Sequence, residues 1–159
     1  SETTIAQRIV RAKKAIANDD PLENWKARGC DAVVNDGLLT MTGKGKPGTA
    51  FLGHGMAKMI GPVVVKVRVR SEAGGAGKVE WLPKGAADPS ILKSVPFTVA
   101  GGDWQEVSID VADDGPLGTM RVYLPAGAKP VDVDWIEVRG KSAKVKPQRW
   151  DFNAGGSNR

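Results

Sequence analysis

The chain has 159 residues, of which 41% are hydrophobic and 26% are charged, and its formal net charge is +5 at pH 7. This length and composition are typical of one globular domain with short extensions. The single cysteine excludes an internal disulfide and a cysteine-rich zinc site, and the single histidine excludes a multi-histidine metal site. The apolar runs are too short for a membrane-spanning helix.

The positive charge is concentrated near the two ends of the chain. Residues 1–18 carry a net charge of +3 and residues 139–159 a net charge of +5, whereas residues 19–138 hold 13 basic and 16 acidic side chains. A nucleic-acid-binding domain usually gathers its basic side chains on the folded face that contacts the phosphates. We therefore expect no nucleic-acid partner.

The first segment, residues 1–20, predicts a helix over 4–17. Its apolar residues recur at spacings of 4, 3 and 4 and form one stripe: Ile5, Ile9, Ala12 and Ile16. The stripe is narrow and lacks bulky aromatic residues, so it does not favour binding to a membrane surface. We expect a docking or linker helix and no membrane partner.

Residues 22–139 predict an all-β domain. Short alternating segments are separated by turn sequences such as Asn35-Asp36-Gly37. The expected strands are 31–34, 37–42, 49–53, 62–70, 77–82, 95–99, 104–111, 119–124 and 131–138. Many short strands with frequent turns favour an antiparallel β-sandwich. Residues 140–159 lack a strand pattern and predict a basic C-terminal arm that either wraps the domain or is disordered.

The segment 62–70 is the most regular of these strands. Its four odd-numbered valines, from Val63 to Val69, share one face and predict the core. Three cations with neighbours about 6.8 Å apart occupy the other face: Lys66, Arg68 and Arg70. Two interpretations remain open. The cations form cross-strand charge pairs on a solvated face, or they provide a platform for sulfate or carboxylate groups.

Aromatic and histidine side chains supply further candidate ligand-binding residues. The chain has five tryptophans among nine aromatic residues, and indole rings stack on the apolar faces of sugars. Alternation points Trp81 inward, although it precedes a loop and could border a site. Alternation in 119–124 points Arg121 and Tyr123 outward. His54 lies between two glycines in a predicted loop, where it is either simply solvated or donates to a sugar hydroxyl or sulfate.

The sequence offers no arrangement of catalytic residues. No G-x-S-x-G motif occurs, and Cys30 has no implied histidine partner. The carboxylate pair at Asp113 and Asp114 lies in a predicted turn, where aspartate is expected for backbone reasons. We therefore predict no catalytic residue and no enzymatic activity of this chain.

The segment 129–138 resembles the closing strand of galactose-binding-like jelly rolls, which include family 6 type carbohydrate-binding modules. The matched pattern is apolar-Asp-aromatic-Ile-x-apolar: Val133, Asp134, Trp135, Ile136 and Val138. The order of the other segments, from Gly61-Pro62-Val63 to Arg121-Val122-Tyr123-Leu124, resembles β-sandwich domains appended to secreted bacterial sulfatases of planctomycete type. The resemblance covers residues 22–139 and implies a jelly-roll fold.

The resemblance also implies a function. It indicates a noncatalytic, secreted or periplasmic accessory domain that binds polysaccharide for a parent enzyme. The sulfatase signature C/S-x-P-x-R is absent, so any sulfatase activity would belong to a parent catalytic domain. A sulfated polysaccharide would suit the cations at 66, 68 and 70. The alternative is a structural domain that docks on or oligomerises the parent without binding glycan.

We predict no cofactor, although many such folds carry a structural calcium, for which Glu23 and Asp134 are the only suggested ligands here. The metal therefore stays unassigned. The predicted ligand-binding residues are Lys66, Arg68, Arg70, Trp81, His54, Tyr123 and Arg121.

Overall fold

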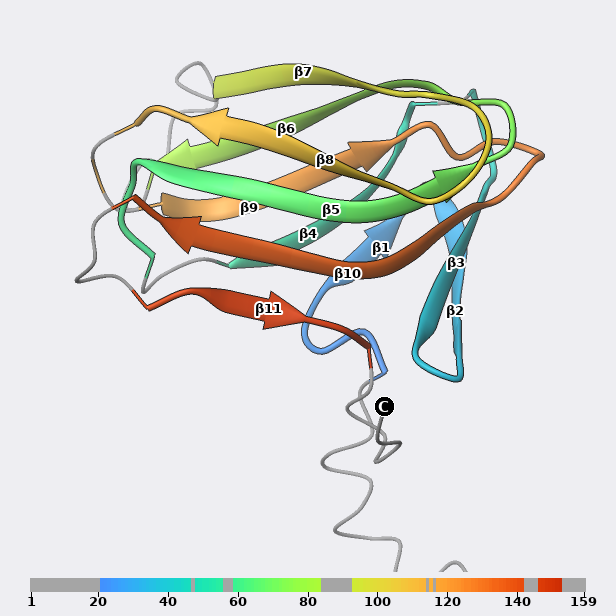
Figure 1. Cartoon of the computed structure of the whole chain (residues 1–159), viewed down its shortest axis with the longest axis horizontal. Coiled ribbons are helices and arrows are strands. Elements are labelled where there is room, and N and C mark those ends of the chain that lie inside the picture. The colour runs from blue at the N-terminus through green and yellow to red at the C-terminus, as the bar shows by residue number, and fades with distance from the viewer. Residues whose placement is uncertain are drawn as a thin grey trace, which may run out of the picture.

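The computed structural model describes residues 21–46, 48–55, 59–83, 93–113, 115, 117–141 and 146–152, and this part of the chain is built of strands (Figure 1). The first sheet has the order β1 (Lys26–Arg28), β4 (Ala50–Gly55), β9 (Leu117–Leu124), β6 (Gly75–Pro83) and β7 (Lys93–Val99). The second sheet has the order β2 (Cys30–Asn35), β3 (Leu38–Gly43), β10 (Val131–Gly140), β5 (Val63–Ser71) and β8 (Gln105–Val111). A short strand, β11 (Gln148–Trp150), pairs with β10.

The core lies between the two sheets, as the alternating sequence predicts. The four odd-numbered valines of β5 are fully buried, and so are Met120, Val122 and Leu124 of β9 on the facing sheet. Burying one such apolar side chain stabilises the fold by about 2 kcal/mol. Every strand pair is antiparallel. The predicted all-β antiparallel sandwich is therefore confirmed.

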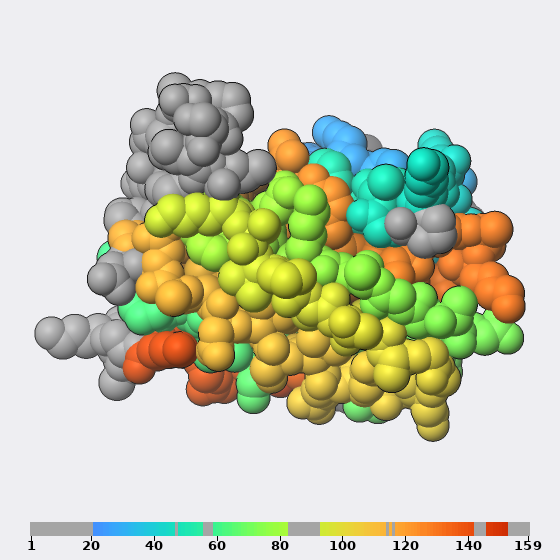
Figure 2. Space-filling model, turned by 90° about the horizontal axis from the view of Figure 1, so that it is seen from above, coloured from blue at the N-terminus to red at the C-terminus, as the bar shows by residue number. Residues whose placement is uncertain are grey.

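The two sheet edges formed by β7 and β8 lie on the same side of the sandwich. Figure 2 looks onto this side, where the atoms of β7 cross the middle of the view in yellow-green. Pro96 interrupts the hydrogen-bonding capacity of β7, and Lys93 and Ser94 are exposed. Proline and charge on an edge strand oppose pairing with another chain.

Nine of the strands match the predicted segments, with ends that differ by a few residues. Strands β1 and β11 were not predicted, because three residues are too few to show an alternating pattern. Strand β11 corrects the expectation that residues 140–159 contain no strand. The helix predicted over 4–17 lies outside the described residues. No helix of the length and apolar character needed to cross a membrane occurs in the part of the chain that the structure describes.

Strand β11 closes one corner of the sandwich by lying along β10 (Figure 1). Trp150, at the end of β11, is opposite Ile136 and is only 8% exposed. Its ring contacts the buried Trp25, with 5.2 Å between centroids, and His54, with 5.1 Å. The arm thus wraps the domain through residue 152, where the buried Phe152 takes the positive φ of 60°.

Charged contacts join the outward side of β11 to β10. Arg149 donates hydrogen bonds to the carboxylate of Glu137 on β10, and its guanidinium lies 3.9 Å from the centre of the Trp135 ring. Burial by itself would raise the pKa of Glu137, but hydrogen bonds from Arg139 and Arg149 outweigh it and lower that pKa. Glu137 therefore stays ionised between two arginines, and it links β11 to β10.

The packing of β11 predicts the effect of truncating its anchor. Trp150→Ala should lower the free energy of unfolding by about 3 kcal/mol, since it removes a buried aromatic ring and leaves a cavity beside Trp25. Chemical denaturation followed by circular dichroism measures this loss. The control is Val33→Ala, at a side chain that is 53% exposed, which should change stability by less than about 0.5 kcal/mol. Equal stability of the two variants would contradict the anchoring role of β11.

Candidate functional site

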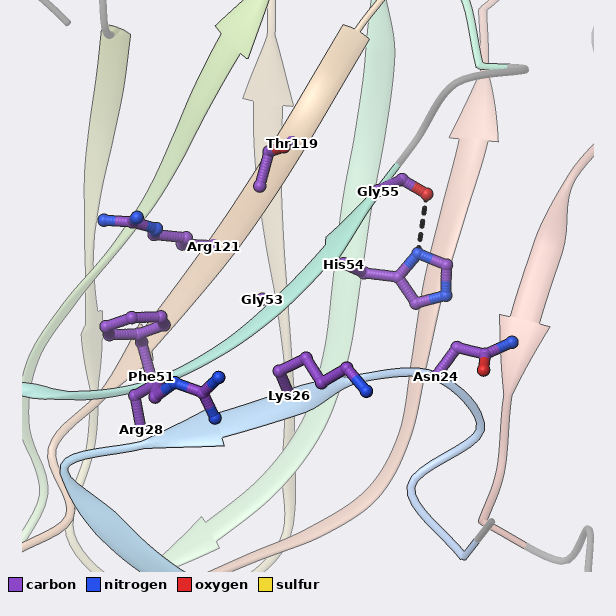
Figure 3. A pocket seen from close by; sticks show the side chains of 9 residues that line it. All are labelled: Asn24, Lys26, Arg28, Phe51, Gly53, His54, Gly55, Thr119 and Arg121. Atoms are coloured by element: carbon purple, nitrogen blue, oxygen red, sulfur yellow. Dashed lines mark hydrogen bonds between the residues drawn. The ribbon is translucent and has the colours of Figure 1, made fainter.

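A shallow groove of about 280 Å³ lies on the outer face of the first sheet, across β1, β4 and β9 (Figure 3). We call it the β4 groove. Its lining residues are Asn24, Lys26, Arg28, Phe51, Gly53, His54, Gly55, Thr119 and Arg121. Two of the predicted ligand-binding residues, His54 and Arg121, are therefore brought together here.

Strand register explains why these side chains share one face. Gly53 of β4 pairs with Lys26 of β1 on one side and with Arg121 of β9 on the other. The next inward residue, Leu52, is fully buried in the core. Since successive residues of a strand point to opposite faces, positions 51, 53 and 55 face outward. The groove thus follows β4, with β1 and β9 as its walls.

An aromatic pair lies at one end of the groove. The rings of Phe51 and Tyr123 have centroids 4.8 Å apart and are tilted by 43°. The guanidinium of Arg121 lies 4.8 Å from the centre of the Phe51 ring, and the ammonium of Lys78 lies 4.6 Å from that of Tyr123. The predicted residue Tyr123 is therefore adjacent to the groove. Each of the two rings therefore has a cation over one of its faces.

Carboxylates balance the charges of the groove cations only in part, since Glu80 lies opposite Arg121 in the strand register. Among the described residues, Lys26, Arg28 and Arg121 form no ion pair. Lys78 differs, because its ammonium lies 2.9 Å from a carboxylate oxygen of Glu80, and this hydrogen bond raises the pKa of Lys78. The β4 groove therefore carries net positive charge.

His54 lies in β4, and the prediction that it lies in a loop was wrong. The glycines on both sides suggested a loop, but they occupy outward positions of a regular strand. The His54 ring donates from Nδ1 to the carbonyl oxygen of Gly55 at 2.7 Å (Figure 3). It also contacts the Trp25 ring, with 5.0 Å between centroids. These contacts fix the ring at the border of the groove.

The cations at 66, 68 and 70 lie on the outer face of the second sheet, away from the groove. Arg68 pairs with Asp134 at 3.2 Å, and Arg70 makes two hydrogen bonds to Asp132, at 2.8 and 3.2 Å. Both guanidinium groups also lie over the Trp104 ring, at 5.3 and 4.5 Å. For these two arginines the structure shows cross-strand charge pairing, so their charges are largely compensated. Lys66 faces outward on the same strand.

Trp81 belongs to neither outer face. It is 4% exposed, lies opposite the buried Met120 and donates from Nε1 to Asp113 at 3.0 Å. Its ring is therefore not available to stack on a ligand. The hydrogen bonds from Trp81 and Lys93 lower the pKa of Asp113 against a smaller opposing effect of burial. This cluster joins the turn after β8 to β6 and β7.

The lowered pKa of Asp113 predicts a dependence of stability on pH. The contribution of the ionised carboxylate is present above the ordinary pKa of 3.8 and is lost as the pH falls through the lower folded value. Asp113→Asn should therefore unfold at lower urea concentration than the wild type at pH 7, and the difference should narrow at pH 3. The control is Asp31→Asn, whose exposed ion pair with Lys44 contributes little at either pH. A constant difference for Asp113→Asn would contradict this assignment.

The two residues suggested for calcium lie in different segments, Glu23 before β1 and Asp134 within β10. No group of three histidine, cysteine, aspartate or glutamate side chains suited to a metal ion occurs among the described residues. Asp134 instead pairs with Arg68 on the second sheet. The suggested calcium site therefore stays a prediction.

Sequence reasoning missed the other seven lining residues of the groove, among them Lys26, Arg28 and Phe51. The lysine and arginine lie on β1, which is too short to show alternation. Phe51 lies in a predicted strand, but nothing in the sequence shows that this strand pairs with β1 on one side and β9 on the other. The groove depends on pairing between segments that are distant in the chain.

Comparison with solved structures identifies the architecture. No family model and no curated protein matches this sequence. The C-terminal CBM6 of LamC, a marine laminarinase from Zobellia galactanivorans, superposes with a TM-score of 0.53 at 16% identity and covers 74% of this chain and 94% of its own. The fold is that of a jelly-roll carbohydrate-binding module. The predicted resemblance to family 6 modules is thereby confirmed for the fold.

Two other carbohydrate-binding modules share this architecture. CBM29_1 from Piromyces equi has a TM-score of 0.54 at 18% identity and covers 73% of this chain and 79% of that chain. The CBM22-1-GH10 modules of Xyn10B from Clostridium thermocellum, complexed with xylohexaose, have a TM-score of 0.58 at 11% identity and cover 75% of this chain. The match spans 26% of the Xyn10B chain. At these identities the likeness concerns the fold.

Proposed function

We propose that this domain is a noncatalytic module that binds an anionic polysaccharide in the β4 groove. The observation that carries the proposal is a set of three cations that form no ion pair with any described residue and lie beside an aromatic pair on an outer sheet face: Lys26, Arg28 and Arg121. The fold supports the ligand class, because structural neighbours occur in complexes with mannohexaose, cellulohexaose and xylohexaose. We propose no catalytic step for this chain.

The chemistry of the groove favours sulfate or carboxylate groups on the sugar. Arginine side chains bind such groups through paired, charge-assisted hydrogen bonds, and lysine acts as a point charge. The rings of Phe51 and Tyr123 offer apolar surface to the C–H face of a sugar. An uncharged glucan would meet the rings but leave the cations without partners. We therefore propose a preference for sulfated or uronic-acid-containing chains.

The proposal includes an association with a larger enzyme. A module of this fold joined to a GH10 module in Xyn10B supports a role as an accessory domain of a secreted or periplasmic polysaccharide-active enzyme. A sulfatase would be a suitable parent, because its substrate would carry the anionic groups that the groove favours. In that arrangement the module would keep the parent catalytic domain near its polymer.

Affinity electrophoresis tests the ligand class. Native gels containing heparin, carrageenan or alginate should retard the protein, whereas gels containing neutral glucans should retard it much less. The retardation should weaken as sodium chloride is raised from 50 to about 300 mM, because salt screens exposed charges. Equal mobility in all gels would refute polysaccharide binding and favour the structural alternative, in which the domain docks on its parent without glycan.

A double substitution locates the binding face. Lys26→Gln with Arg121→Gln should weaken binding to the retained polysaccharide by about tenfold or more, since two charge-assisted contacts are lost. The measured quantity is the polymer concentration that gives half-maximal retardation. The control is Lys66→Gln, which removes one outward cation from the other sheet, so binding should change less than twofold. Loss of binding in Lys66→Gln with full binding in the double variant would move the site to the second sheet.

A further inference from the structure

Two glycines form the outward row of β4 beyond Phe51. Gly53 and Gly55 occupy alternate positions, and both line the β4 groove (Figure 3). Glycine inside a strand weakens it, because it has no side chain to pack and it loses more conformational freedom on folding. A glycine at such a position therefore needs a physical reason.

The fold itself does not require glycine at either position. Neither residue has the positive φ that favours glycine. A Cβ at Gly53 would make only ordinary contacts, 3.6 Å from Cε1 of Phe51 and 3.7 Å from Cγ of Arg121, and one at Gly55 would meet nothing within 4 Å. Gly77 of β6 is different, since a Cβ there would clash at 2.5 Å with the carbonyl oxygen of Tyr123. The two β4 glycines are therefore explained neither by backbone conformation nor by packing.

Neither glycine adds a side chain to the floor of the groove, where Gly53 is buried between the side chains of Phe51 and Arg121 and Gly55 is exposed. Gly53 lies in register between Lys26 and Arg121, so a cation stands on each side of the bare backbone. Neighbouring strands are about 4.8 Å apart, which places the Cα atoms of these two residues about 9.6 Å from each other. The Phe51 ring borders the same space along β4 (Figure 3).

We propose that Gly53 is the seat of one sugar ring that carries acidic substituents, with Lys26 and Arg121 binding those substituents from opposite walls. This inference rests on the proposed function and narrows it. The ring lies over the floor formed by Gly53 and the exposed Gly55, and glycine determines specificity because a larger residue would raise that floor. Close approach of a ligand to backbone is a recognised reason for glycine within a strand. Gly55 extends the same floor toward the next part of the chain.

The decisive variant is Gly53→Ala, which adds one methyl group to the floor without a clash in the protein. The melting temperature should stay the same or rise, because alanine restricts the unfolded chain and contacts Phe51. Binding to heparin or carrageenan, whichever retards the wild type, should weaken about tenfold or more. The reason is that the added methyl group occupies space that the sugar ring would fill. Binding that falls while stability is maintained separates recognition from folding.

A matched glycine outside the groove is the control. Gly115 lies in the turn between β8 and β9, and a Cβ there would also meet nothing within 4 Å. Gly115→Ala should bind as the wild type does. If Gly53→Ala binds as the wild type does while the Lys26 and Arg121 double variant loses binding, the ring seat is refuted. The proposed function would still hold in that case. No binding by the wild type itself would instead overturn the proposed function.

A competition experiment distinguishes a sugar seat from a simple anion site. Sodium sulfate should displace the bound polysaccharide no better than sodium chloride at the same ionic strength, because isolated sulfate lacks the ring that fills the floor. If millimolar sulfate displaces the polymer while chloride at equal ionic strength does not, the groove binds the anion alone, and the ring seat is refuted.

Discussion

Burial of every second side chain between the two sheets is the constraint on which the whole domain depends. The valines of β5 and the facing residues of β9 have no exposed surface, so the register of both strands is fixed. A slip by one residue would turn these apolar side chains to solvent and bring arginines into the core. The same constraint decides which residues face outward. Recognition on this scaffold is therefore limited to side chains that the core has already placed on the two outer faces.

The two outer faces differ in how their charges are compensated. On the second sheet, β10 places Asp132 and Asp134 beside the arginines of β5, and Trp104 supports both guanidinium groups. On the first sheet, β4 contributes glycines and an aromatic ring, and the cations of β1 and β9 form no ion pair among the described residues, although Glu80 lies opposite Arg121 in register. Paired arginines have already satisfied much of their hydrogen-bonding capacity. Unpaired ones can satisfy it with a ligand, which is why the proposed site lies on the first sheet.

The corner closed by β11 connects the fold to the groove. Trp25 and Trp150 come from opposite ends of the described chain, and their rings contact each other and His54. His54 borders the groove from the same side. Packing of the terminal strands thereby holds β1 against β4, and β1 supplies one cationic wall. Stability at this corner and the shape of the groove are consequently linked.

The sequence by itself determined the class of the fold, because alternation in long strands such as β5 depends only on local order and on which side chains avoid water. It also identified His54, Arg121 and Tyr123 as candidates, and the structure brings these three together. Only the tertiary structure decided that the arginines of β5 are paired, that Trp81 is buried, and that Lys26, Arg28 and Phe51 share the groove. The physical reason is that charge compensation and groove shape arise across neighbouring strands. Packing of the whole chain decides which strands become neighbours, and no local sequence pattern shows that arrangement.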